Sequence, residues 1–392
     1  MKILFTGDVN FRGIEPLDGK KSTEIISELL PYLSSADFRI LNLEAPLADK
    51  ENHTPIEKSG PNLICDPSSI IFLKKFGADG VTLANNHIGD FGEGAVKNTL
   101  DVLDEGGILH AGAGANVSQA YEAMHFEKSG VRVAVISVCE NEFGMATKKT
   151  FGSAGYEPRR LLKQIQEERS KADFVTVVFH GGNEFCPLPS PDTVERYRLI
   201  CDMGADAVIG GHTHCPQGYE YYGGKPIVYS IGNLLFTSQN KPDPNDSWYY
   251  GYAVILNIEE SLSLELVPYK YDKKATKIHV FGGEDKEKML EYIEHISEII
   301  QDEEELCKHF KGWAWHHPWI PTPPKDLEKL EVYRLCANMN LLFCEAHHSQ
   351  SKAVFEALYK KETALVRQYE AKIKALQKMP TLSDEQEMRY EN

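Results

Sequence analysis

Two histidines that stand one residue apart follow a pair of glycines in the segment Gly210-Gly211-His212-Thr213-His214. In an extended segment both imidazole rings would project toward one area, and glycine lets another group approach the backbone closely. Imidazoles are ligands for zinc, manganese and iron. One pair of this kind is a moderate indication, so a metal site requires further ligands elsewhere in the chain.

Potential ligands also stand at the ends of four other short apolar runs. Asp8 follows KILFTG, Glu44 follows FRILNL, Asn86 follows GVTLAN and His180 follows FVTVVF. Each residue alone has a more ordinary interpretation as a turn residue or a structural histidine. Five runs that all end in such groups are harder to explain in that way, because open α/β sheets place their sites at the carboxyl ends of the strands.

Such a set of carboxylate, amide and imidazole groups suits one or two divalent ions, with manganese, iron and zinc as candidates. Two ions about 3.5–4 Å apart that share a carboxylate would activate water and hold both oxygens of a displaced ester. The residues predict a metal site of this type, and they leave the number of ions open.

The elements that must position these residues alternate along the first 280 residues. Seven apolar runs bounded by Gly, Asp or Asn predict strands that are covered on both faces. They occupy 2–7, 38–43, 80–85, 131–138, 174–179, 206–211 and 226–232, with helical patterns at 22–35, 93–106, 157–171 and 191–203. This alternation predicts an α/β core. Two later runs, 252–258 and 262–271, alternate more strictly and predict an antiparallel pair.

The pattern changes near Gly282-Gly283. Beyond it there is almost no strand signal, and residues 286–310 and 326–378 are rich in the helix formers Glu, Lys, Leu and Ala. The segment 311–324 between them holds four prolines and three tryptophans. The prolines predict a linker without a continuous helix, and the tryptophans predict that this linker lies against the core.

Composition makes some classes of partner unexpected. The 392 residues include 42 basic and 58 acidic side chains, so the net charge of −16 provides no global attraction to nucleic acid or anionic membranes. No run approaches the roughly 18 apolar residues of a transmembrane helix, and the first run is too short for a signal peptide. The eight cysteines form no C-x-x-C pair. We therefore expect reduced thiols and a cytoplasmic protein that does not insert into membranes.

Six motifs together resemble those of the CapA family of bacterial capsule-synthesis proteins. They are GDVN (7–10), NLEAPL (42–47), ANNHIGDFG (84–92), HGGNE (180–184), GGHTHxxQ (210–217) and YSIGN (229–233). The resemblance covers roughly residues 1–240, and it implies a link to poly-γ-glutamate capsule synthesis. It also implies a calcineurin-like metallophosphoesterase fold, a four-layer α/β/β/α sandwich. We expect this domain at 1–282, with 283–392 as a helical extension docked on it.

The resemblance also implies a role for each ligand. Asp8 and His214 would hold a first metal, Glu44 would bridge, and a second metal would be held by Asn86, His180 and His212. Two positions depart from the phosphoesterase pattern. Asn10 stands where a histidine ligand of the first metal is usual, as a weaker ligand, and Glu44 replaces the usual bridging aspartate.

His87 would not bind metal in this scheme, and it would act as the general acid that faces the leaving group. Asp90 could orient the His87 ring, with the alternative that it caps the helix expected from residue 93. Arg12 could bind an anionic group of a substrate, with a surface arginine as the ordinary alternative. Glu184 could contact the site or be a solvated loop charge.

Three functions fit these features. The first is a metal-dependent hydrolase that cleaves phosphoesters, with His87 as general acid. The second is a factor that makes or processes poly-γ-glutamate or another cell-envelope polymer and acts at an amide. The third is a non-catalytic metal-binding accessory of capsule-synthesis proteins. In each case we expect an anionic small-molecule or polymer ligand and no nucleic acid.

Overall fold

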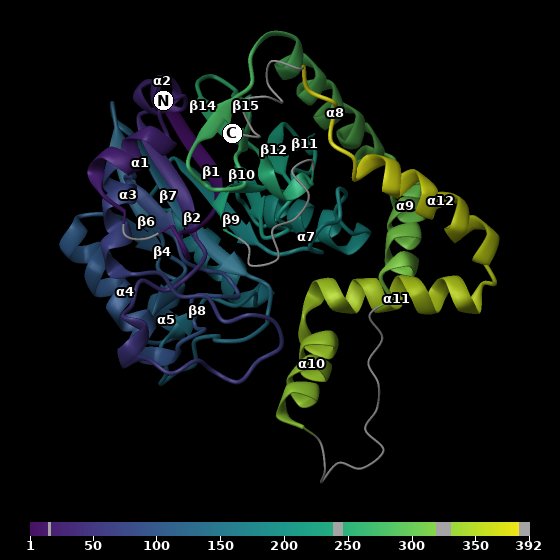
Figure 1. Cartoon of the computed structure of the whole chain (residues 1–392), viewed down its shortest axis with the longest axis horizontal. Coiled ribbons are helices and arrows are strands. Elements are labelled where there is room, and N and C mark those ends of the chain that lie inside the picture. Colours follow the sequence, from purple (N-terminus) through teal and green to yellow (C-terminus); the bar gives the residue numbers. More distant parts are fainter. Residues whose placement is uncertain (15–16, 238–245, 319–330, 384–392) are drawn as a thin grey trace.

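The fold is built on two β-sheets that pack face to face (Figure 1). It is seen in a computed structural model that describes residues 1–392 apart from 15–16, 238–245, 319–330 and 384–392. The first sheet has the strand order β16 (Ile278–Val280), β15 (Leu262–Tyr271), β14 (Tyr250–Ile258), β1 (Lys2–Asn10), β2 (Phe38–Leu43), β3 (Gly80–Thr82) and β4 (Leu109–Ala111), and β13 (Asn233–Phe236) also pairs with β1. The second sheet has the order β11 (Tyr219–Tyr222), β12 (Lys225–Val228), β10 (Ala207–Gly211), β9 (Phe174–His180), β7 (Val131–Cys139) and β6 (Met124–Lys128). Two short strands, β5 (Ala113–Gly114) and β8 (Gly152–Ser153), form a separate pair.

The central strands of each sheet run parallel, which brings their carboxyl ends to one edge. Strands β1 to β4 are parallel in the first sheet, and β7, β9, β10 and β12 are parallel in the second. Antiparallel strands β14 to β16 extend the first sheet beyond β1. One apolar core fills the space between the sheets, where Phe38 of β2 stacks on Phe126 of β6 with ring centroids 3.8 Å apart.

Helices cover the outer faces of both sheets. On the first sheet lie α1 (Gly19–Ile25), α2 (Leu30–Ser35), α3 (Ile70–Phe76) and α4 (Gly92–Gly106), with the 3₁₀ turns η1 (Lys50–Asn52) and η2 (Pro67–Ser69) in the connecting loops. On the second sheet lie α6 (Pro158–Arg169) and α7 (Pro191–Asp202), while α5 (Val117–Ala120) and η3 (Ser247–Tyr249) are single turns. The expected four-layer α/β/β/α sandwich is confirmed.

The sequence located most central strands to within a few residues, but it misplaced some boundaries and missed several short strands. The helix expected at 22–35 is divided into α1 and α2, with Pro31 in the first turn of the second helix. The run at 226–232 ends as a strand at Val228, and the chain then turns at Gly232 into β13, which was not expected. Strands β4, β5, β6, β8, β11 and β16 were also missed, because they are short or carry many charged and polar side chains.

The C-terminal region is helical, as expected from its composition. It comprises α8 (Gly283–Gln301), α9 (Glu303–His316), α10 (Val332–Phe343), α11 (Glu345–Tyr359) and α12 (Thr363–Leu376) (Figure 1). Helix α9 continues through Trp313 to His316, so the expected break at 311 was wrong, since the first proline of that segment is Pro318. Residues 319–330 of the expected linker lie outside the described residues.

One face of this region shares a core with the second sheet. Ile296 and Ile300 of α8 and Phe310 and Trp313 of α9 belong to the same buried cluster as Val177 of β9. This packing joins α8 and α9 to the second sheet. Whether 1–282 and 283–392 fold as separate units stays a prediction.

All eight cysteines are free thiols, and seven of them are buried. Their reduced state in the cell stays a prediction. Within the part of the chain that the structure describes, none of the helices combines the length and the apolar character that a membrane crossing needs. A cytoplasmic location stays a prediction.

Replacing Phe310 with alanine tests how tightly the C-terminal helices are joined to the core. Phe310 is 2% exposed, so Phe310→Ala should lower the free energy of unfolding by about 3–5 kcal/mol. The matched control is Phe343→Ala on α10, where the ring is 66% exposed and the loss should stay within about 0.5 kcal/mol. Chemical denaturation of both variants measures the difference, and equal stabilities would contradict the shared core.

Candidate metal centre

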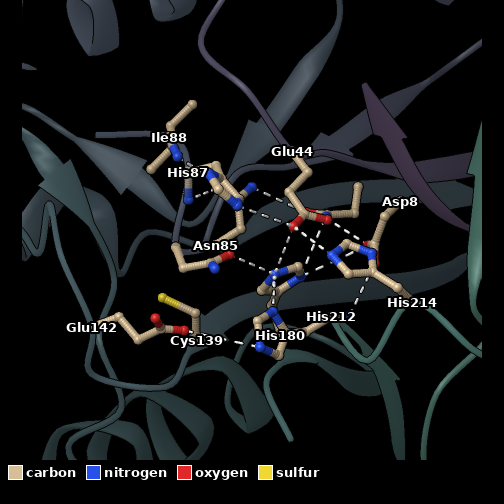
Figure 2. Close-up of polar contacts among 12 residues, drawn as sticks. Asp8, Glu44, Asn85, His87, Ile88, Cys139, Glu142, His180, His212 and His214 are labelled. Atoms are coloured by element: carbon tan, nitrogen blue, oxygen red, sulfur yellow. Dashed lines mark hydrogen bonds and ion pairs between the residues drawn. The ribbon is translucent and has the colours of Figure 1, made fainter. Parts of the chain in front are cut away.

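The predicted ligands meet at the common edge of the two sheets. Asp8 lies near the end of β1 and Glu44 directly after β2, while Asn86 follows β3. His180 is the last residue of β9, and His212 and His214 follow β10. All six side chains are buried, and Figure 2 shows the labelled carboxylates and imidazoles pointing toward one another. The structure thus brings the six predicted ligands together, and their role as metal ligands stays a prediction.

His180 Nε2 is the centre of one group of ligand atoms. It lies 3.1 Å from His212 Nδ1, 3.2 Å from Asn86 Oδ1 and 3.6 Å from Glu44 Oε1. Ligands about 2.0–2.2 Å from one ion stand roughly 3.3–3.6 Å from one another in a tetrahedral site. The three distances from His180 Nε2 are close to the spacing of ligands around one divalent ion.

A second group consists of Asp8, Glu44 and His214, whose ligand atoms lie within 4.8 Å of one another. His214 Nε2 is 3.8 Å from Glu44 Oε1. In the first group, the ligand atoms of Glu44, His180 and His212 also lie within 4.8 Å of one another. Glu44 therefore belongs to both groups, which is the position of a bridging ligand.

Glu44 itself gives the clearest sign that a cation belongs here. Its side chain is fully buried, and neither carboxylate oxygen has a hydrogen-bond partner among the described residues. Burial and the neighbouring Asp8 carboxylate raise the pKa of Glu44 well above its usual range. A buried carboxylate without a partner is costly, whereas a cation would satisfy both oxygens. The residues present fit a divalent metal.

The imidazoles are arranged as neutral ligands. Burial lowers the pKa of His180, and burial together with the neighbouring His180 and His214 lowers the pKa of His212 well below its usual range. A neutral imidazole offers a lone pair to a metal, so burial favours the ligating form of both side chains.

Side chains around the ligands set their orientation, and the sequence alone did not assign these roles. Asn233 Oδ1 lies 2.9 Å from His214 Nδ1, so the other ring nitrogen is left to face Glu44. Asn42 Nδ2 donates to Asp8 Oδ1 at 2.7 Å, and the His212 backbone N–H donates to Asp8 Oδ2 at 2.9 Å. Asn42 and Asn233 both lie in quoted motifs, where an asparagine has too many ordinary roles to indicate this one.

The backbone of the His-x-His segment differs from the extended form expected from the sequence. His212 has φ 87° and His214 has φ 55°, so both residues adopt left-handed conformations that non-glycine residues seldom use. The chain therefore bends, and both rings still reach the cluster. Such strain is retained where the surrounding structure enforces it, often at functional sites. The expected close approach to a glycine is confirmed at Gly210, where the Tyr229 backbone lies against the chain. A Cβ at this position would be only 1.9 Å from the Tyr229 carbonyl oxygen, so a larger residue would clash.

His87 lies beside the cluster and is held from behind by Asp90. Its Nδ1 is 2.6 Å from Asp90 Oδ2, and its Nε2 is 4.0 Å from Glu44 Oε1. The alternative that Asp90 caps the following helix is wrong, since the N-cap of α4 is Phe91 and no side chain caps it. Lys58, which sequence reasoning missed, donates to Asp90 Oδ1 at 2.5 Å. Burial and the Lys58 ammonium group lower the pKa of His87 to about 4.

The other predicted residues are placed as follows. Asn10 Oδ1 accepts hydrogen bonds from the Arg12 backbone N–H at 2.9 Å and from Cys65 Sγ, so its role as a metal ligand stays a prediction. Arg12 and Glu184 line a cavity of about 710 Å³ that also reaches His87 and His214. Their contact with a substrate stays a prediction.

Two packed sheets with a cluster of buried imidazoles and carboxylates at the carboxyl edge give the chain a metallophosphoesterase-like fold. The chain belongs to the family described as bacterial capsule synthesis protein PGA_cap, whose model matches residues 2–238. The expected resemblance to CapA is confirmed.

Curated relatives support the same family. The chain is 30% identical over 246 residues to the capsule biosynthesis protein CapA of Bacillus anthracis. This match covers 60% of each chain. It is 30% identical over 237 residues to the PGA biosynthesis protein CapA of Bacillus subtilis (strain 168), covering 59% of this chain and 62% of that one. The chain thus spans about 60% of the length of these relatives.

Solved structures with similar folds include a hypothetical protein from Thermus thermophilus, at 16% identity and a TM-score of 0.43, covering 69% of this chain and 99% of that one. A novel phosphatase from Mycoplasma pneumoniae matches at 17% identity and a TM-score of 0.39, covering 71% of this chain and 90% of that one. Likeness at this level says nothing about the reaction.

Removing the shared carboxylate tests the metal centre. Manganese or zinc at about 100 times its dissociation constant should stabilise the protein by about 2.7 kcal/mol, because the ion binds the folded state. Glu44→Gln should abolish most of this gain, while in metal-free buffer the variant should be as stable as the parent or more so, since a buried charge is gone. Melting curves with and without ion measure both effects. An unchanged metal response in Glu44→Gln would exclude Glu44 as the shared ligand.

Proposed function

We propose that the protein is a metal-dependent hydrolase of the CapA family that cleaves a phosphoester in an anionic substrate. The observation that carries this proposal is the joint arrangement of two ligand groups that share Glu44 with a buried histidine, His87, directed at the same point. A site that only binds a ligand has no need for an oriented, non-ligating imidazole next to the metal groups.

The side chains would divide the work as follows. When bound at Asp8, Glu44 and the cluster histidines, a divalent ion polarises an ester and lowers the pKa of water. Asp90 holds Nδ1 of His87, so Nε2 faces the site. An anionic substrate next to His87 would raise the pKa of the ring and protonate Nε2. As the new bond from water to phosphorus forms and the bond to the leaving oxygen breaks, this Nε2 proton would pass to that oxygen.

The cavity next to His87 and His214 suits an anionic substrate. Its described lining includes three basic side chains, Arg12, Lys273 and Lys274, and one acidic side chain, Glu184. Basic side chains thus outnumber acidic ones in the cavity, whereas the whole chain has 58 acidic and 42 basic residues. The Arg12 backbone is held at both ends, because its N–H donates to Asn10 Oδ1 and its carbonyl accepts from Thr237 Oγ1. A guanidinium on such a fixed backbone can bind phosphate or carboxylate in a defined geometry.

The second candidate function is cleavage or transfer at an amide of poly-γ-glutamate. Family membership and the basic cavity favour it, because each residue of that polymer carries a carboxylate. A panel of phosphomonoesters, phosphodiesters and γ-glutamyl peptides with added manganese separates the two candidates. Tight metal binding without turnover of any of them would support a non-catalytic accessory of capsule-synthesis proteins.

Replacing His87 tests the general acid. His87→Ala should lower turnover of a phosphoester with a poor leaving group by about 10²–10⁴-fold, because the leaving oxygen then departs without a proton. The loss should shrink for a good leaving group, and metal content should stay unchanged. His212→Ala is the comparison, since it should lower metal content together with activity. Equal rates of parent and His87→Ala on the poor leaving group would end the assignment.

Replacing Arg12 tests the substrate pocket. A hydrogen bond between charged groups contributes about 1.5–3 kcal/mol, so Arg12→Ala should raise KM about 10–150-fold for an anionic substrate. The turnover number should change much less if Arg12 contacts only a part of the substrate remote from the reaction. The control is Arg159→Ala at the exposed start of α6, which should leave KM unchanged. Equal KM values in both variants would remove Arg12 from the pocket.

A further inference from the structure

The loop that follows β7 connects the C-terminal helices to the metal centre. Three consecutive residues, Glu140 to Glu142, are each held by a side chain of this helical region. Glu140 Oε2 accepts from Cys344 Sγ at 3.6 Å, the Asn141 backbone N–H donates to Glu345 Oε2 at 2.9 Å, and Glu142 Oε2 accepts from Asn340 Nδ2 at 3.2 Å. A second bond joins Asn141 Nδ2 to Glu345 Oε1 at 2.7 Å.

The same loop also reaches the metal ligands. The Glu140 backbone N–H donates to the His180 carbonyl oxygen at 3.0 Å. Glu142 Oε1 lies 3.9 Å from His212 Nε2, the ring nitrogen that is not directed at His180. The two oxygens of Glu142 therefore face different partners, Asn340 on α10 and the outer nitrogen of His212. Figure 2 shows Glu142 on the side of the histidines away from Glu44.

We infer that Glu142 is a positioning residue for the metal ligand His212, that Asn340 of the C-terminal helices holds Glu142, and that Glu345 holds the neighbouring Asn141. The C-terminal helices would thus help to set metal affinity, although they lie beyond the family-matched residues 2–238.

The physical basis is the usual arrangement around metal-bound histidines. A carboxylate at the second ring nitrogen fixes the tautomer and orientation of the ring and makes the ligating nitrogen more basic. At 3.9 Å the Glu142 and His212 atoms are beyond hydrogen-bond distance, and such contacts often tighten when a site is filled. Glu142 is nearly buried, so solvent screens its interaction with His212 only weakly.

A purely structural role for the same contacts is the main alternative. In that case Asn340 and Glu345 would only attach the helices to the core, and their loss would change stability but not metal affinity. The chain offers a matched contact for comparison, because Ser349 Oγ on α11 donates to Asp192 Oδ2 of α7 at 2.8 Å. This contact joins the same helices to the core without involving the loop at 140–142.

The experiment measures the affinity of the metal-free, full-length protein for Mn²⁺ by titration calorimetry. Outer-shell partners typically contribute about 10–100-fold to metal affinity, so the isosteric Glu142→Gln should weaken Mn²⁺ binding by about that factor. Asn340→Ala should weaken it in the same direction and to a smaller extent. Ser349→Ala should leave the affinity unchanged, and melting of each metal-free variant shows that it is folded.

A double variant shows whether Asn340 acts through Glu142. If it does, Asn340→Ala should have little further effect on affinity in the Glu142→Gln background. Unchanged Mn²⁺ affinity in a folded Glu142→Gln protein would overturn the inference and leave the metal centre intact. Equal losses in Asn340→Ala and Ser349→Ala would also overturn it. A parent protein that binds no Mn²⁺ would overturn the inference together with the metal centre.

Discussion

A single buried carboxylate determines how the rest of the site is arranged. Glu44 has three imidazoles around it, with nitrogen atoms of His180, His214 and His87 at 3.6, 3.8 and 4.0 Å from its Oε1. Neither oxygen is satisfied by another described residue, so the site is unfavourable until a cation occupies it. Two of these rings, His87 and His180, do not solve this problem by becoming charged, since burial lowers the pKa of both. The two-sheet core must supply the stability that the site lacks.

The location of the site could be predicted because it depends on strand direction. A polar residue after a buried run lies at the carboxyl edge whatever the details of packing, and this places Asp8, Glu44 and His180 together. Partners that come from loops could not be found in this way. Lys58 and Asp90 are 32 residues apart in the sequence, and Glu142 and His212 are 70 residues apart. No sequence pattern indicates that either pair lies close together in the fold. The bend at His212 was also missed, since positive φ at a histidine has no signature in sequence.

Lys58 changes the electrostatics of His87 in a way that the family motifs do not indicate. Asp90 accepts hydrogen bonds from Lys58 and from the backbone N–H of Leu63, and it also holds the His87 ring. The Lys58 ammonium group is 3.3 Å from His87 Nδ1, and it opposes a positive charge on the ring. Asp90 therefore fixes the direction of Nε2 and favours a charged ring, while burial and Lys58 together keep the free imidazole neutral by lowering its pKa. An anionic group that enters next to His87 would shift this balance toward the protonated ring.

The physical unit that holds the metal ligands is larger than the segment matched by the family. Strand β1, which carries Asp8, lies between β2 and β14, and residues Lys2 to Phe5 pair with Val254 to Asn257, beyond the family match at 2–238. Asn233, which orients His214, is in turn held by the carbonyl oxygen of Trp248. Sequence motifs record the side chains that contact a ligand, whereas the position of each side chain depends on the strands and loops that pack behind it. For this protein those supports extend from β14 through the C-terminal helices, so ligand geometry and the architecture of the C-terminal region have to be understood together.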